Sequence, residues 1–463
     1  MAKRILFLTG HLARARLEKV LAETRDLGFE WSVVDVGVKV AALMTEAIIA
    51  RRLPRPVVAN RVMVPGRCRA DLARLAAEFG VPFERGPDEL KDLPAFFGKH
   101  GRGADLSRHD MRIFAEIVDA SALNVDAILA RAASMRAAGA DVIDLGCLPD
   151  TPFPHLEDAV RVLRANGHAV SVDSADAQEL LRGGRAGAQF LLSLTEATVE
   201  IASETGAVPI LVPATHGELP SLLRAAEAAD RRGISAILDP VLDPIHFGFM
   251  RSLERYAELR RRLPAAEILM GTGNLTELTD ADSVGVTAAL LGICSELFIH
   301  NLLVVQVSPH TRRTIQEHDA TRRLMFAARE DASLPKDYGS ALLSLHDRKP
   351  FPNTPSEIGE VAAQVKDANF RIEIAEDGIH VYNRDGHRVA QDAMSLFASL
   401  GVDNDGPHAF YLGTELMKAE IAWRLGKRYA QDSPLDWRCA ADRPVEDLTR
   451  LAAAGHTLRT AKR

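Results

Sequence analysis

The middle of this 463-residue chain repeats one unit, and the repetition constrains the fold more than any other feature. Eight short apolar runs, rich in β-branched residues, are separated by about 20–30 residues, and most intervals have the pattern of an amphipathic helix. Buried parallel strands have this appearance. Eight strand–helix units are what a closed (β/α)₈ barrel, the TIM-barrel architecture, requires. An open doubly wound sheet is the competing architecture. The runs are Ile113–Val118, Val142–Leu145, Ala169–Val172, Gln189–Leu192, Pro209–Val212, Ala236–Leu238, Glu267–Met270 and Leu297–Val305.

The residues before the repeats alternate between strand and helix patterns, which predicts a small Rossmann- or flavodoxin-like α/β domain. Residues 82–110, rich in proline, glycine and charge, are typical of a connector. The strands are expected at 4–9, 31–36 and 61–64, and the helices from about 11 to 27, 40 to 52 and 69 to 79.

The residues after the repeats have a different character. Asn369–Ile374 alternates apolar and polar residues, a turn follows at 376–378, and Ile379–Tyr382 returns, which predicts an antiparallel hairpin. Helices are expected over about 390–400 and 415–425, after a proline-punctuated linker at 349–355. We therefore predict three domains: an N-terminal α/β domain (1–105), the barrel (106–330) and a C-terminal α+β domain (340–463).

Charge, cysteine usage and hydropathy narrow the class of protein. A net charge of −7 argues against a general nucleic-acid binder. The four cysteines lie far apart, unlike a paired zinc motif or a disulfide framework. The apolar run Ile5–Leu8 is too short for a signal peptide, and no run approaches the length of a membrane span. We expect a cytoplasmic protein that binds neither nucleic acid nor membrane.

The carboxyl ends of the predicted barrel strands carry polar residues, and these ends line the one mouth where such barrels bind ligands. Four aspartates converge there. They could hold Mg²⁺, accept hydrogen bonds from the N–H groups of a heterocycle, or simply cap the following helices. The polar strand-end residues are Asp119, Asp144, Asp173, Ser193, Thr215 with His216, Asp239, Asn274, and Gln306 or His310.

Three segments, in order and spacing, resemble the dihydropteroate synthase signatures: Gly139–Gly146, Val170–Ser174 and Ala236–Pro240, the last followed by Phe247 and Gly248. The resemblance covers about residues 113–310. It implies a pterin-binding barrel whose reaction joins a hydroxymethyl-dihydropterin diphosphate to an arylamine, with pyrophosphate leaving and Mg²⁺ assisting. It also implies that Asp173 and Asp239 contact the pterin ring. With the other strand-end residues, we expect a pterin site formed by Asp119, Asp144, Asp173, Ser193, Asp239 and Asn274.

The departures from that family concern the second substrate. The loop Cys147–Pro152 lacks the arginine that helps the family hold p-aminobenzoate, and Val118–Asn124 replaces its first-strand loop. Where the family has Ser-Arg-Lys, Gly271–Thr276 is closer to the segment of methyltetrahydrofolate methyltransferases whose asparagine contacts the pterin. The fourth-strand asparagine is replaced by Ser193.

The whole chain is similar to dihydropteroate synthase-related proteins of methanogens and methylotrophic bacteria, through His408–Glu420 and Leu425–Asp432. Membership would imply one-carbon metabolism and methylotrophy: tetrahydromethanopterin biosynthesis, with a ribosylated aniline as the arylamine. Two alternatives stay open, a pterin-dependent methyl transferase and a non-catalytic pterin-binding protein. Because this barrel family commonly dimerises, we expect a homodimer.

Other polar residues near the mouth are secondary candidates. A basic or histidine residue after the last strand helps the family bind the diphosphate, and the expected groups are His310, Arg312 and Arg313. His216, Asp243 and His246 are further candidates for the mouth. Separately, the backbone N–H groups of Thr9–His11, after the first strand of the chain, could hold an anion.

Overall fold

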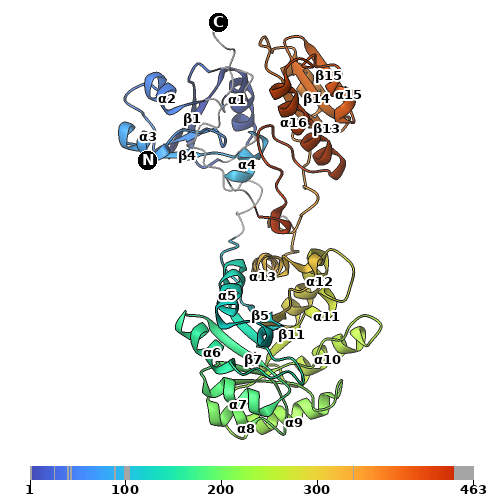
Figure 1. Cartoon of the computed structure of the whole chain (residues 1–463). Coiled ribbons are helices and arrows are strands. Elements are labelled where there is room, and N and C mark those ends of the chain that lie inside the picture. Colours follow the sequence, from blue (N-terminus) through green and yellow to red (C-terminus); the bar gives the residue numbers. More distant parts are fainter. Residues whose placement is uncertain are drawn as a thin grey trace. The chain divides into compact units, whose positions relative to one another are not determined.

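The computed structural model describes residues 3–24, 27–38, 41, 44–87, 90–97, 105–336 and 338–442. These residues form two compact units (Figure 1). One comprises the described residues up to 97 together with 343–437 and 442, and the other comprises 105–342 and 438–441. Whether the regions 1–105 and 340–463 are separate domains stays a prediction. Residues 443–463 of the second region lie outside the described part of the chain.

Eight parallel strands in the second unit close into a barrel, which confirms the barrel and rules out an open sheet. The order around the barrel follows the sequence, and the last strand pairs with the first through Leu302 and Ile113. The strands are β5 (Arg112–Ile117), β6 (Val142–Gly146), β7 (Ala169–Asp173), β8 (Phe190–Leu194), β9 (Val208–Leu211), β10 (Ile237–Leu238), β11 (Glu267–Gly271) and β12 (Asn301–Val304).

Helices follow the strands and surround the barrel (Figure 1). Local sequence sets their ends. The side chain of Asn124 accepts a hydrogen bond from the N–H of Ala127 at 2.8 Å at the start of the first helix. That helix ends at Gly139, whose φ of 119° favours glycine. The helices are α5 (Val125–Ala138), α6 (Leu156–Ala165), α7 (Ala177–Arg185), α8 (Glu200–Thr205), α9 (Leu219–Asp230), α10 (Phe249–Arg262), α11 (Gly273–Thr276), α12 (Ser283–Glu296) and α13 (Thr314–Glu330), with short 3₁₀ turns η4 (Ala120–Ala122) and η5 (Pro309–Thr311).

Successive side chains of each barrel strand point alternately toward the helices and into the barrel interior, so they form two separate apolar clusters. On β5, Ile113, Ala115 and Ile117 belong to the large cluster that includes residues of the helices. Phe114 belongs to a smaller cluster of strand residues alone, which fills the barrel interior. Because successive side chains point to opposite faces, Glu116 points into the same interior as Phe114. The interior is therefore apolar near the strand starts and polar toward the carboxyl ends.

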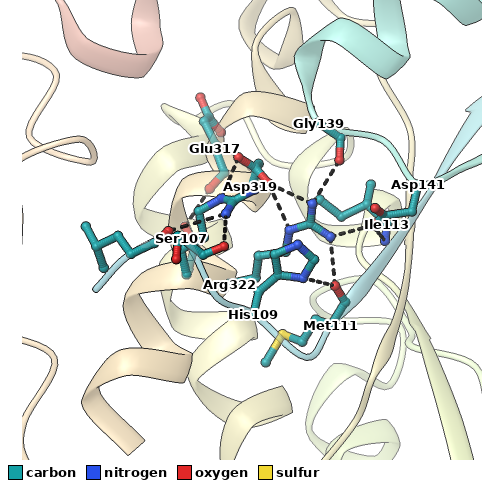
Figure 2. A network of polar contacts seen from close by, with 12 residues as sticks. Ser107, His109, Met111, Ile113, Gly139, Asp141, Glu317, Asp319 and Arg322 are labelled. Carbon is teal, nitrogen blue, oxygen red and sulfur yellow. Dashed lines mark hydrogen bonds and ion pairs between the residues drawn. The ribbon is translucent and has the colours of Figure 1, made fainter. Parts of the chain in front are cut away.

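A buried arginine ties the last helix to the starts of the first two strands (Figure 2). Arg322 of α13 is only 2% exposed, and it donates to the carbonyl oxygens of Met111 at 2.7 Å and Gly139 at 3.0 Å. It also pairs with Asp319 at 2.7 Å and with Asp141. The network lies at the amino ends of the strands, the face of such barrels that serves stability rather than catalysis.

The first unit contains a four-stranded parallel sheet in the order β2-β1-β3-β4 and a three-stranded antiparallel sheet, β13-β14-β15. A long helix, α16, packs on the antiparallel sheet. The elements are β1 (Arg4–Thr9), η1 (His11–Ala13), α1 (Arg14–Glu23), β2 (Glu30–Asp35), α2 (Glu46–Arg52), β3 (Arg61–Val64), α3 (Leu72–Phe79), β4 (Phe83–Arg85), η3 (Leu90–Asp92), α4 (Leu93–Phe96), α14 (Pro355–Ala362), β13 (Arg371–Ala375), β14 (Gly378–Asn383), β15 (Gly386–Ala390), α15 (Ala393–Phe397) and α16 (Gly406–Leu425); η6 (Arg438–Ala440) belongs to the second unit.

The structure differs from the sequence prediction in several elements. The supposed connector 82–110 contains β4, which pairs with β3. The eighth barrel strand begins at Asn301 rather than Leu297, because α12 ends there and Phe298 has a φ of 52°. The C-terminal hairpin has a third strand, β15, and α16 begins at Gly406 rather than near 415. Each missed element is short or lies within a stretch of turn-forming residues.

Candidate functional site

Three carboxylates from neighbouring strands meet inside the barrel, toward the carboxyl ends of the strands: Glu116 of β5, Asp144 of β6 and Asp173 of β7. One oxygen of each lies within 4.8 Å of the others. The strand register explains this, because Glu116 lies opposite Asp144 and Asp173 lies opposite Gly146. Asp144 and Asp173 were expected at the mouth. Glu116 was missed because it comes before the end of its strand; the available signal was a charged residue within a buried apolar run.

These carboxyl groups are poorly solvated. Asp144 is 0% exposed, and among the described residues no hydrogen-bond partner lies within reach of either of its carboxyl oxygens. Burial, with Asp173 and Glu116 close by, raises its pKa well above the ordinary value. Burial, followed by the charge of Asp173, raises the pKa of Glu116 to about 7. The cluster can therefore share protons near neutral pH, bind a cation, or accept N–H donors from a ligand.

A glycine makes room for the cluster. A Cβ placed on Gly146 would lie 2.6 Å from Oε1 of Glu116, and 3.2 Å from the backbone of Val118. Real side chains essentially never approach so closely, so a larger residue at this position would displace Glu116. The glycine at the end of β6 thus lets the Glu116 carboxyl group lie directly against the strand.

Ser193 supports Asp173 through an unusual backbone conformation. Its φ is 74°, at an irregularity in the pairing of β8 with β9 between Leu192 and Leu194. Bulges of this kind turn a side chain to a new direction. The Ser193 hydroxyl donates to Oδ1 of Asp173 at 2.7 Å. Burial raises the pKa of Asp173, and this hydrogen bond opposes the rise.

Asp239 follows β10 and lies across the interior. It is 7% exposed and accepts two hydrogen bonds at the same oxygen, Oδ1: from the Tyr256 hydroxyl at 2.7 Å and from the N–H of Val241 at 2.8 Å. Burial raises its pKa to about 6, although these bonds lower it, and the charge of Asp173 raises it further. Within the described residues, Oδ2 of Asp239 receives no hydrogen bond.

Asn274 and Asp119 lie nearer the rim. Asn274 is the second residue of α11 and is exposed, and its amide nitrogen donates to the carbonyl of Leu242 at 2.7 Å. Asp119, half exposed, pairs with Arg131 at 2.5 Å. Neither belongs to the buried cluster.

Asp243 lies between the side chains of Arg255 and His216. It is 4% exposed and lies 2.8 Å from Arg255 and 2.7 Å from Nε2 of His216, a ring that is itself 68% exposed. Arg255 also donates to the carbonyls of the loop after β10. The pairing holds this loop in place and leaves His216 accessible from solvent. His246 is exposed, with a φ of 70°.

The groups expected to bind a diphosphate follow β12 and differ in their surroundings. A ring nitrogen of His310 lies 3.0 Å from the carbonyl of Thr276, and Nε of Arg313 donates to the carbonyl of Cys439 at 3.1 Å. The side chain of Arg312 is exposed. Glu277 orders the loop by accepting the N–H groups of 307 and 308 at 2.8 and 2.9 Å.

No helix within the described ranges combines the length and the hydropathy that crossing a membrane requires.

Sequence comparison gives two matches of unknown activity. The model of a family of unknown function (DUF6513) matches residues 3–88. An uncharacterized protein of Methanocaldococcus jannaschii is 26% identical over 534 aligned residues, which cover 93% of this chain and 99% of that protein.

Solved structures similar to the barrel region include three dihydropteroate synthases. A Yersinia pestis enzyme with a pterine–sulfa conjugate has 19% identity and a TM-score of 0.38, and covers 49% of this chain and 96% of its own. The 7,8-dihydropteroate synthase of Vibrio fischeri has 18% identity and a TM-score of 0.37, and the match covers 49% of this chain and 94% of that one. The Thermus thermophilus enzyme in complex with 6HMPPP has 22% identity and a TM-score of 0.36, and the match covers 48% of this chain and 95% of that one. These values are too low to carry a function to this chain.

Proposed function

We propose that the barrel mouth binds a pterin and that the chain is a dihydropteroate synthase-like transferase. It would join a hydroxymethyl-dihydropterin diphosphate to an arylamine. The observation that carries the proposal is a pair of aspartates at the ends of β7 and β10: Asp173, which is partly buried, and Asp239, which is buried. In each, the side-chain hydrogen bonds are concentrated on Oδ1. The second oxygen of each carboxyl is thereby left to accept a donor from a ligand.

The chemistry of a pterin matches this arrangement. Its 2-amino group and adjacent ring N–H form a row of donors that a carboxyl group can accept, and its flat ring suits a narrow interior. A buried carboxyl without a partner is costly, by about 1–3 kcal/mol for each unsatisfied group. A ligand that supplied the missing donors to Asp144, Asp173 or Asp239 would recover that free energy on binding.

The carboxylate cluster also fits a divalent cation such as Mg²⁺. Glu116, Asp144 and Asp173 would be its ligands, because hard cations prefer carboxylate oxygens and those of Asp144 have no hydrogen-bond partner in the described part of the chain. A bound cation would neutralise negative charge near a departing pyrophosphate. If the cluster holds Mg²⁺, its addition at pH 8 should slow hydrogen exchange of β5–β7 in the natural chain but not in Glu116→Gln.

The second substrate and the pathway rest on the sequence resemblance. The loop Cys147–Pro152 carries no arginine, which favours an arylamine other than p-aminobenzoate, and a ribosylated aniline of tetrahydromethanopterin biosynthesis is the one we propose. Methyl transfer from a tetrahydropterin is the second candidate. It is favoured by the exposed Asn274, whose carboxamide oxygen is available at the rim.

Binding is tested by titrating a dihydropterin into the full-length chain by calorimetry. Asp173→Asn and Asp239→Asn should each weaken binding by about 1–3 kcal/mol, because an amide presents one acceptor and adds a donor that faces the ligand's donors. Asp126→Asn, an exposed position on α5, is the matched control and should bind like the natural chain. Unchanged affinity in both mouth variants would contradict the site assignment.

The reaction is tested separately. The full-length chain is incubated with hydroxymethyl-dihydropterin diphosphate, Mg²⁺ and either p-aminobenzoate or a ribosylated aniline, and pyrophosphate is measured. We expect release with the ribosylated aniline. Tight pterin binding, with no pyrophosphate released from the pterin diphosphate whichever aniline is added, would exclude the transferase and leave a non-catalytic pterin-binding protein. Methyl transfer to a thiol or corrinoid acceptor would establish the second candidate instead.

A further inference from the structure

The first unit contains a cavity of about 410 Å³ at the carboxyl edge of its parallel sheet. Thr9, at the end of β1, and Val64, at the end of β3, form part of its lining. On its other side the lining comes from β13 and β14 of the same compact unit, including Ile372 and Tyr382. This volume is in the range of sites for small organic ligands.

The cavity lies where the sheet topology creates a binding crevice. In the order β2-β1-β3-β4, the chain leaves β1 toward one edge of the sheet and returns to add β3 on the other side. Helices cover both faces: Leu17 of α1 packs with one face of the strands, and Ile49 of α2 and Leu75 of α3 pack with the other. The ends of β1 and β3 therefore form a topological switch point, where open α/β sheets bind ligands.

The charges around the cavity favour an anion. Its lining contains three arginines, Arg16, Arg67 and Arg371, and one carboxylate, Glu373. Glu373 already accepts hydrogen bonds from the Tyr382 hydroxyl at 2.5 Å and from the side chain of Asn353 at 2.6 Å.

The three arginines differ in how far their charge is balanced. Arg371 pairs with Asp367 at 2.9 Å, and Arg16 lies 4.0 Å from a carboxyl oxygen of Glu357. Arg67 donates to the neutral hydroxyl of Ser433, and no ion pair joins it to any described residue. Arg67 is therefore the cation with the most charge left for a ligand.

Among the backbone groups after β1 that the sequence suggested for an anion, the N–H of His11 is already engaged. The N–H of His11 donates to the carbonyl of Val38 at 2.7 Å. A Cβ on Gly10 would lie 2.8 Å from both the carbonyl oxygen of Val38 and the backbone nitrogen of Ala41. Residues 38 and 41 therefore pack closely against this turn, and the guanidinium groups of the lining are the positive charges of the cavity.

We propose that this cavity binds a mononucleotide-sized organic phosphate. Its ring would lie against the apolar wall that includes Leu12, Met63 and Ile374, and its phosphate would pair with Arg67, with Arg16 beside it. A planar guanidinium matches a phosphate through two parallel hydrogen bonds. The site belongs to a different unit from the barrel mouth, and the proposal is independent of pterin binding.

The test is calorimetric titration of the full-length chain with AMP, adenosine and inorganic phosphate. We expect AMP to bind more tightly than either of its parts, because only AMP contacts both the apolar wall and the arginine. Arg67→Met should weaken AMP binding by roughly tenfold or more, and Arg67→Lys should restore part of it. Leu12→Glu, which adds a negative charge to the wall of the cavity, should also weaken AMP binding.

Arg61→Met is the matched control, because Arg61 lies at the opposite end of β3 and pairs with Glu84 at 2.8 Å. It should bind AMP as the natural chain does. The proposal is wrong if AMP produces no binding heat at millimolar concentration. It is also wrong if Arg67→Met and Arg61→Met have equal affinity for AMP, since the phosphate would then lie elsewhere.

Discussion

Glu116→Gln tests the electrostatics of the carboxylate cluster most directly. Glutamine has nearly the same shape but cannot ionise. In the folded chain the pKa of Glu116 is raised from 4.5 to about 7, first by burial and then by Asp173. The folded state therefore binds this proton more tightly than the unfolded state does. The resulting stability is fully present below about pH 4.5 and is lost as the pH rises through 7.

The size of the effect follows from the two pKa values. The gap between 4.5 and about 7 corresponds to roughly 3 kcal/mol of unfolding free energy lost between pH 4.5 and 8.5. Glu116→Gln should remove most of that loss and be more stable than the natural chain at pH 8.5. Some dependence on pH should remain, because burial and its neighbours also raise the pKa of Asp144.

The assay must report on the barrel alone. Trp31, Trp423 and Trp437 are the only tryptophans of the chain, and all lie outside residues 105–342, so their fluorescence follows the other unit. Hydrogen exchange of peptides from β5–β7, measured by mass spectrometry between pH 4.5 and 8.5 and corrected for intrinsic exchange, is suitable. Glu200→Gln, at an exposed position of α8, is the control. If Glu116→Gln lost stability with pH as steeply as the natural chain does, the assigned pKa would be refuted.

Two further substitutions test packing in the barrel. Arg322→Met leaves two aspartates near the amino ends of the strands without their buried cation. It should lower the stability of the barrel by about 3–5 kcal/mol. The control Arg161→Met, at an exposed position, should be nearly neutral in the same hydrogen-exchange assay. Gly146→Ala places a methyl group against Glu116 and should destabilise the barrel by about 1–3 kcal/mol. In a double-mutant cycle, Glu116→Ala should relieve most of that cost. Strictly additive effects of the two substitutions would show that the contact is unimportant.

The barrel could be predicted because its signal is local and repeated. Each of the eight strands is a short apolar run between a helix and a turn, and the observed bounds depart appreciably only at Leu297–Val305. Hydrophobic periodicity carries such information in every unit. Short elements in polar surroundings, such as β4 and β15, were missed because few residues define them and their pairing partners stabilise them.

The aspartates at the strand ends were visible in the sequence, but their surroundings were not. The sequence made Asp173 a main candidate and Asp243 a secondary one, but it did not show the partners of either carboxylate. In the folded chain, Asp173 accepts a hydrogen bond from the hydroxyl of Ser193, whereas Asp243 lies between Arg255 and His216. Sequence spacing does not determine which cation will reach a carboxylate, because the partners come from different strands and helices.

By itself, the sequence determined the eightfold strand–helix repeat and the aspartates at the carboxyl ends of the strands, since both depend on local patterns. Tertiary structure alone decided that Glu116 joins Asp144 and Asp173, that Gly146 makes room for it, and how far each pKa is raised. Those properties depend on strand register and burial, which bring together residues far apart in the chain and remove them from water.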